Sequence, residues 1–162
     1  MKLRILWNSE ATYLSTGYST YCREVLKRLH ATGKYDILEY ASYADRYDKR
    51  INDIPWDIYP VLPDNRNPDE VKNYNSHPIN QFGAWKFEEI CCDFKPHVVF
   101  DLRDFWMMAY QANSPYRNYF NLVWMPTVDA YPQHLEWVEK YSQCDAIFTY
   151  SDWAINILRN QA

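Results

Sequence analysis

The chain has 162 residues and a formal net charge of −4 at pH 7, from 17 Lys and Arg against 21 Asp and Glu. This length fits a single domain, and 48% hydrophobic with 23% charged residues is a globular profile, which excludes an intrinsically disordered chain. The mild acidity gives no reason to expect nucleic-acid binding, which normally needs a basic patch, and no stretch approaches the ~20 apolar residues of a transmembrane segment.

The amino-acid usage is unusual in two ways. Only 3 residues are Gly, which leaves few tight turns and disfavours an all-β protein built from hairpins. Aromatic residues make up 18% of the chain. They either fill the core or provide flat surfaces on which a sugar or a base stacks.

The four cysteines are Cys22, Cys91, Cys92 and Cys144. They have no CxxC spacing, so they give no support for a zinc site. The apolar run near the N-terminus is too short to predict a signal peptide. Thiols without a secretory signal are typical of a reducing compartment, and they predict a cytoplasmic protein.

Apolar runs along the chain predict the strands. The first covers residues 2–7 and ends at the polar segment 8–10. Later strands are predicted at 35–41, 58–62, 97–100, 119–125 and 145–150. Pro60 indicates an edge position for the third strand, because proline has no N–H to donate to a neighbour. The run at 97–100 is almost continuously apolar, which is typical of a strand covered on both faces.

Helical patterns separate most of these strands. Thr16 is a suitable N-cap for a first amphipathic helix, and Gly33 is a suitable stop signal after it. The segment 63–78 is rich in Pro, Asn and Asp and predicts a loop, and a second helix is predicted at 80–94. Further helices are predicted from Phe105, from Pro132 and after Ser151.

Strands that alternate with helices predict an α/β fold. Right-handed crossovers then produce a Rossmann-like doubly wound sheet, mainly parallel, of about six strands with helices on both faces. The whole chain, residues 1–162, forms one such domain. Ligands of these sheets bind outside the carboxyl ends of the strands. That rule selects four segments for one rim, at residues 8–10, 101–104, 126–129 and 149–152, although strand ends are polar in any case because they meet water.

The loop before the first helix is a candidate binding site. It contains Thr16, Gly17, Tyr18 and Ser19. The free N–H groups and the dipole of a helix N-terminus favour a phosphate or a carboxylate. Neither GxGxxG nor GxxxxGK[ST] is present, which disfavours a dinucleotide-dependent or nucleotide-hydrolysing enzyme. A plain capping turn is the alternative interpretation.

Charged residues follow two of the buried strands. Arg103 is suited to clamp an anionic group, and Asp104 or Asp129 to orient a hydroxyl or accept its proton. The alternatives are an ion pair between neighbours, with Asp104 capping the helix from Phe105 and Asp129 capping the turn into Pro132. No D-x-D motif occurs, so a metal-assisted nucleotide-sugar site of that type has no support.

These segments together resemble the N-terminal half of GT-B-fold glycosyltransferases of the family-4 type. The resemblance extends from residue 2 to about residue 160. Four parts of the sequence carry the resemblance. They are the first strand together with residues 16–21, which begin the following helix, residues 95–100 leading into 104–106, residues 123–129, and residues 144–154.

The resemblance implies one half of a two-domain hexosyltransferase. The N-terminal domain of such an enzyme mainly holds a carbohydrate or other hydroxyl acceptor, and a C-terminal domain mainly holds the nucleotide-sugar donor, with no metal or other cofactor required. The family's E-x7-E donor motif has no counterpart in this chain, so the chain alone is expected to be inactive. The catalytic residues implied are Asp129 and Asp104, and the ligand-binding residues are Thr16, Gly17, Tyr18, Ser19, Arg103 and Ser151.

Two other functions stay open at this point. One is a non-catalytic module that binds a sugar or another ligand with the same fold. The other is a flavodoxin-like or similar small α/β enzyme complete in itself, for which only the turn at Thr16 and Gly17 offers a phosphate loop.

Overall fold

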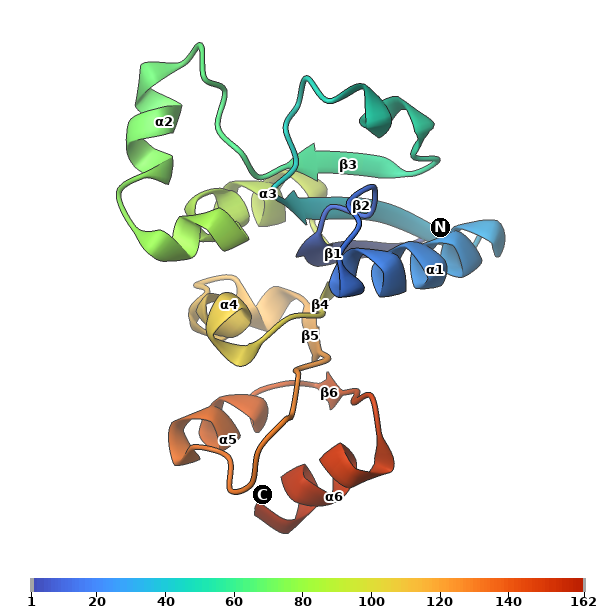
Figure 1. Ribbon diagram of the computed structural model, residues 1–162, viewed down its shortest axis with the longest axis vertical. Coiled ribbons are helices and arrows are strands. Elements are labelled where there is room, and N and C mark those ends of the chain that lie inside the picture. Colours follow the sequence, from blue (N-terminus) through green and yellow to red (C-terminus); the bar gives the residue numbers. More distant parts are fainter. Residues whose placement is uncertain (1, 162) are drawn as a thin grey trace.

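The computed structural model describes residues 2–161. Its strands form one parallel sheet in the order β3-β2-β1-β4-β5-β6, which runs down the long axis of the molecule (Figure 1). This order is that of a doubly wound sheet, and it confirms the predicted α/β Rossmann-like fold. The strands are β1 (Leu3–Glu10), β2 (Tyr35–Ser42), β3 (Asp57–Pro60), β4 (Val98–Asp101), β5 (Asn121–Trp124) and β6 (Ala146–Ile147).

Helices of different lengths connect these strands (Figure 1). The α-helices are α1 (Gly17–Ala31), α2 (Pro68–Tyr74), α3 (Phe87–Phe94), α4 (Phe105–Met108), α5 (Leu135–Tyr141) and α6 (Asp152–Gln161). Short 3₁₀ segments lie at 49–53, 78–82, 84–86, 109–113 and 117–119. No helix within the described residues is both long and apolar enough to cross a membrane.

The alternation of side chains along β1 explains how helices cover both faces of the sheet. Successive residues of a strand point to opposite faces. Trp7 packs in one buried cluster with Cys22 and Leu26 of α1. Leu6 packs in another with Phe87 of α3. That second cluster also contains buried side chains of α4, β5 and α5, so most of the core lies on the face opposite α1.

Local signals at both ends of α1 act as the sequence predicts. The Thr16 hydroxyl accepts a hydrogen bond from the Ser19 N–H at 3.1 Å, which satisfies one free donor of the first turn. Gly33 follows the helix at φ +65°, a conformation that favours glycine. The amide of Gly33 donates to the carbonyl of His30 at 3.0 Å. Both predicted boundaries of this helix are confirmed.

Two elements near the C-terminus are shorter than predicted, since β6 covers only Ala146–Ile147 of the predicted 145–150 and α5 begins at Leu135, after the N-cap position His134, and not at Pro132. Three elements nearer the N-terminus also differ from the prediction. The first strand continues through the polar segment to Glu10, because Asn8 and Ser9 are fully buried and stay paired with β2. A short helix, α2, forms within the predicted loop, where the Asn67 side chain accepts from two N–H groups of its first turn. The predicted helix at 80–94 is interrupted, because Gly83 adopts φ +101° between two 3₁₀ segments.

Candidate functional site

A cavity of about 560 Å³ opens at the carboxyl edge of the sheet, beside the N-terminus of α1. Residues from β1, α1 and the segments after β5 and β6 line it: Glu10, Thr16, Gly17, Tyr18, Tyr21, Thr127 and Tyr150. Three of the four strand-end segments predicted to share one rim therefore meet here. The fourth, 101–104, joins through a hydrogen bond between Asp104 and Tyr18.

Another hollow, of about 610 Å³, lies at the opposite edge of the sheet. His97, Asn121 and Asp145 line it, next to the amino ends of β4, β5 and β6. Ligands of open parallel sheets bind at the carboxyl ends of the strands, where the strand order reverses. The cavity beside α1 is therefore the better candidate site, although it is slightly smaller.

Tyr18 ties three parts of the site together. Its hydroxyl donates to Asp104 Oδ1 at 2.7 Å and lies 2.8 Å from the Thr127 hydroxyl. These contacts connect α1 with the segments that follow β4 and β5. Burial raises the pKa of Tyr18 to about 12, and the negative charges of Asp104 and Glu10 add to this effect. The Tyr18 hydroxyl is thus a neutral hydrogen-bond donor at physiological pH.

The raised pKa of Tyr18 has a measurable consequence. A tyrosine with an ordinary pKa near 10 is about 90% ionised at pH 11, whereas one with a pKa of about 12 is only about one-tenth ionised. We expect the ¹³Cζ resonance of Tyr18, assigned by its absence in Tyr18→Phe, to keep its neutral shift up to pH 11. A midpoint near pH 10 would contradict the burial of this hydroxyl beside the Asp104 carboxylate.

Glu10 and Thr16 form the rim above the first turn of α1. The Thr16 hydroxyl donates to Glu10 Oε2 and lies 2.7 Å from the Ser19 hydroxyl. Thr16 therefore lines the cavity as predicted for a ligand-binding residue, but its hydrogen bonds are directed to the protein. Ser19 is fully buried and supports the cap instead of facing the cavity.

Gly17 is not required by the backbone. A Cβ atom at this position would meet no atom within 4 Å, and its φ lies outside the positive range. The capping turn therefore tolerates other residues. Gly17 lines the cavity at the helix N-terminus, and because it has no side chain it leaves the cavity open there.

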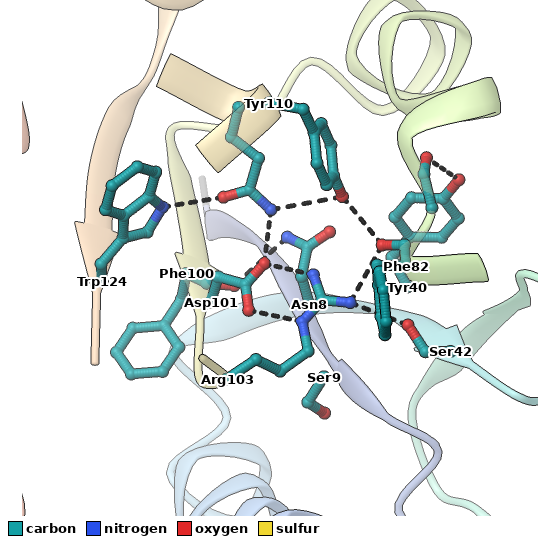
Figure 2. Close-up of polar contacts among 12 residues, drawn as sticks. Asn8, Ser9, Tyr40, Ser42, Phe82, Phe100, Asp101, Arg103, Tyr110 and Trp124 are labelled. Carbon is teal, nitrogen blue, oxygen red and sulfur yellow. Dashed lines mark hydrogen bonds and ion pairs between the residues drawn. The ribbon is translucent and has the colours of Figure 1, made fainter. Parts of the chain in front are cut away.

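Arg103 does not lie at the rim, contrary to its predicted role in ligand binding. Its guanidinium is fully buried and pairs with Asp101 (Figure 2), with Nε donating to Oδ1 at 2.8 Å. Nη1 donates to the Ser42 hydroxyl at 2.8 Å and to the Phe82 carbonyl at 2.9 Å. Burial by itself would lower the pKa of Arg103, but the adjacent Asp101 carboxylate raises it, so the side chain stays protonated. Of the alternative predicted for this segment, the ion pair between neighbours is observed, whereas Asp104 makes no side-chain capping bond to α4.

The buried pair belongs to a larger polar network below the strand ends (Figure 2). Gln111 donates to Asp101 Oδ2 at 2.6 Å and accepts from the Trp124 indole at 2.9 Å. Tyr110 donates to the Phe82 carbonyl at 3.0 Å. The network connects the ends of β2, β4 and β5 with the segment 78–82. It therefore holds these strand ends in place and does not line the cavity.

The two predicted catalytic carboxylates occupy different positions. Asp104 precedes α4 without a side-chain capping bond and instead accepts from Tyr18, so it lies one residue behind the cavity wall. Asp129 is exposed on the segment after β5 and is not among the residues lining the cavity. Ser151 is exposed too, and its hydroxyl caps α6 by accepting from Ala154 N–H at 3.2 Å. Its neighbour Tyr150 is the one that reaches the cavity.

Four lining residues were not singled out from the sequence: Glu10, Tyr21, Thr127 and Tyr150. Three of them lie within the strand-end segments that the topology selected, so the segments were found but not the individual side chains. Tyr21 follows Gly17 by four residues, and this spacing places both on one face of a helix. No group of three or more His, Cys, Asp and Glu side chains in residues 2–161 is arranged to hold a metal ion.

Comparison with models of protein families found no match, and comparison with curated proteins found none either. Solved structures with a similar fold include the UDP-GlcNAc 2-epimerase of Methanocaldococcus jannaschii, with a TM-score of 0.56 and 15% identity. They also include a protein of Listeria monocytogenes described as a UDP-N-acetylglucosamine 2-epimerase, with a TM-score of 0.58 and 13% identity. Each match covers 99% of this chain but only 42% and 43% of the respective neighbour, so the chain spans less than half of their length. At this identity the likeness concerns the fold alone, which is Rossmann-like and of the GT-B type.

Proposed function

We propose that this chain is the acceptor-side domain of a nucleotide-sugar-dependent glycosyltransferase. The observation that carries the proposal is the cavity at the carboxyl ends of β1, β5 and β6, lined by hydroxyls, a carboxylate and aromatic rings. Such a lining suits a ligand with several hydroxyl groups. The fold likeness to two chains described as nucleotide-sugar epimerases supports a link with sugar nucleotides.

The proposal includes a second, donor-binding domain as a partner. Glycosyl transfer requires the acceptor hydroxyl and the donor to be held together in a reactive geometry. The matched neighbours are more than twice as long as this chain, which is consistent with such a partner. A cytoplasmic location stays a prediction, and the four cysteines are free thiols in the structure.

A carboxylate within reach of the acceptor hydroxyl is needed if the transfer uses a general base. Glu10 meets this requirement best, because it lines the cavity. Asp104 acts through Tyr18 and is a positioning residue in this scheme. The role predicted for Asp129 stays a prediction. In a transfer assay, Glu10→Gln is expected to reduce the rate by ~100-fold or more, and a larger loss for Asp129→Asn would assign the base to that residue instead.

Binding of saccharides tests the site directly. We expect the 162-residue chain to show saturation-transfer NMR signals with glucose, galactose, mannose or N-acetylglucosamine. Gly17→Val should abolish these signals, because the new side chain enters the cavity, while the melting temperature changes little since a Cβ there has no close neighbour. A loss of stability with binding intact would show that Gly17 only shapes the turn.

The chain by itself is expected not to consume nucleotide sugars. Its lining contains no Lys, Arg or His, the side chains that would bind a diphosphate, within the part described by the structure. Incubation with UDP-glucose and UDP-N-acetylglucosamine, followed by measurement of released UDP, checks this. Turnover by the isolated chain would contradict the assignment of the domain to the acceptor side.

A sugar-nucleotide epimerase domain is the second candidate, favoured by the descriptions of the two structural neighbours. Such a domain would bind the nucleotide sugar itself and would need no separate acceptor. Direct titration with UDP-N-acetylglucosamine distinguishes the two, since an acceptor domain binds the free saccharide in preference to the nucleotide sugar. A non-catalytic saccharide-binding module would bind saccharides in the same way and support no transfer with any donor domain.

A further inference from the structure

Two exposed tyrosines form an aromatic wall on one side of the cavity. Tyr21 is 41% exposed and Tyr150 is 45% exposed, and their ring centroids lie 5.5 Å apart with an interplanar angle of 75°. Both residues line the cavity, although they come from α1 and from the segment after β6. Covering such exposed aromatic rings with an apolar face of a ligand is energetically favourable. The faces of a pyranose ring carry C–H groups and provide such a surface.

The charge of the cavity is negative. Glu10 lines it, and Asp104 lies one hydrogen bond behind Tyr18. The nearby arginines are engaged elsewhere: Arg103 is buried with Asp101, and Arg23 donates to the carbonyl of Thr12 at 2.9 Å. The lining thus has no positive side chain to balance these carboxylates, within the residues that the structure describes.

Glu10 also lies next to the place that an anionic ligand would take. The N-terminus of a helix attracts negative charge, and phosphates commonly bind there. At α1 the Glu10 carboxylate is held over this end by the hydroxyl of the N-cap residue Thr16. A phosphate approaching the same N–H groups would meet a like charge at close range.

We propose that Glu10 and the Tyr21–Tyr150 wall make this cavity selective for a neutral saccharide over the corresponding phosphorylated sugar. The ring of the saccharide stacks on the tyrosines, and its hydroxyls donate to Glu10. This inference rests on the proposed function, because it specifies the chemical class of the acceptor. It differs from the sequence-based expectation that the helix N-terminus at the Gly17 turn favours a phosphate or a carboxylate as its ligand.

The test compares neutral sugars with their charged counterparts on the full 162-residue chain. Glucose, mannose, galactose and N-acetylglucosamine are titrated alongside their 6-phosphates, with saturation-transfer NMR as the readout. We expect each phosphate to bind roughly ten-fold more weakly than the neutral sugar. Glu10→Gln, which keeps an acceptor for Thr16 but removes the charge, should narrow this difference, and Glu10→Lys should reverse it.

Matched variants show whether the Glu10 charge and the tyrosine wall act specifically, or whether losing any carboxylate or any aromatic ring has the same effect. Glu24→Gln removes a carboxylate from α1, where it pairs with Lys27 and Arg28 away from the cavity lining, and should leave the selectivity unchanged. Tyr150→Leu and Tyr21→Leu should each lower the affinity for neutral sugars by about three- to ten-fold, whereas Tyr150→Phe should leave this affinity unchanged. Tyr119→Leu, at an exposed position at the opposite edge, is the control for the loss of an aromatic side chain.

Each outcome bears on a different claim. Neutral sugars that bind no better than their phosphates, or a selectivity that survives Glu10→Gln unchanged, would overturn this inference and leave the saccharide site in place. Selective binding without transfer when a donor domain is supplied would refute the glycosyltransferase proposal alone. No binding of any saccharide by the folded chain would refute both.

Discussion

Asp101→Asn is expected to lower the free energy of unfolding by about 3–5 kcal/mol, the cost of leaving a buried charge without its partner. Asp101 and Arg103 are both fully buried, and two guanidinium nitrogens donate to the carboxylate. An arginine cannot discharge itself by losing a proton, so its charge stays in the interior after the substitution. Urea unfolding followed by tryptophan fluorescence measures the loss.

A double-variant cycle shows whether the loss comes from the pair. Arg103→Met removes the guanidinium and keeps an apolar side chain of similar length. The combined Asp101→Asn and Arg103→Met variant should lose clearly less stability than the sum of the single losses, because no unpaired charge is left. Additive losses, or a loss below ~1 kcal/mol for Asp101→Asn, a size typical of an exposed ion pair, would contradict the buried geometry.

The parallel sheet was predictable because apolar runs and helical periods are local signals. The edge strand is an example, since Pro60 restricts that run to an edge and β3 does lie at one edge of the sheet. Long-range contacts explain the errors. Asn8 and Ser9 look like the end of a strand, but neighbours on β2 and β4 extend it, and Asn8 Nδ2 donates to the Phe100 carbonyl at 3.2 Å. No spacing within the first ten residues contains that information.

The candidate site was predictable as a place and less so as a set of side chains. The rule for carboxyl ends identified the segments that converge on the cavity, because topology alone determines where strand ends lie. It does not determine which way a side chain points. Arg103 follows β4 as an arginine at the rim would, yet its guanidinium turns inward to Asp101, Ser42 and Phe82. Tyr18, in contrast, reaches both Asp104 and Thr127 across more than 85 residues of sequence.

The three glycines of this chain provide a graded series of alanine substitutions. At Gly83, φ is +101° and a Cβ would lie 2.5 Å from Cε1 of Tyr40. Tyr40 cannot move aside easily, because it is buried in the core and its hydroxyl donates to the Gly83 carbonyl at 2.5 Å. Backbone strain and overpacking each cost about 1–3 kcal/mol, so Gly83→Ala should lose roughly 3 kcal/mol or more.

The other two glycines separate the causes. Gly33 has φ +65° with open space around a Cβ, so Gly33→Ala carries only the backbone cost of ~1–2 kcal/mol. Gly17 has neither a positive φ nor a close neighbour at its Cβ position. The free energy of unfolding of Gly17→Ala should therefore stay within about 0.5 kcal/mol of that of the unsubstituted chain. The urea midpoints of the three variants, compared where the slope of unfolding free energy against urea is the same, test whether the stability loss increases in the order Gly17, Gly33, Gly83. An equal loss at Gly33 and Gly83 would mean that the backbone conformation alone sets the cost, and that the close approach of Tyr40 to the 78–86 segment contributes nothing.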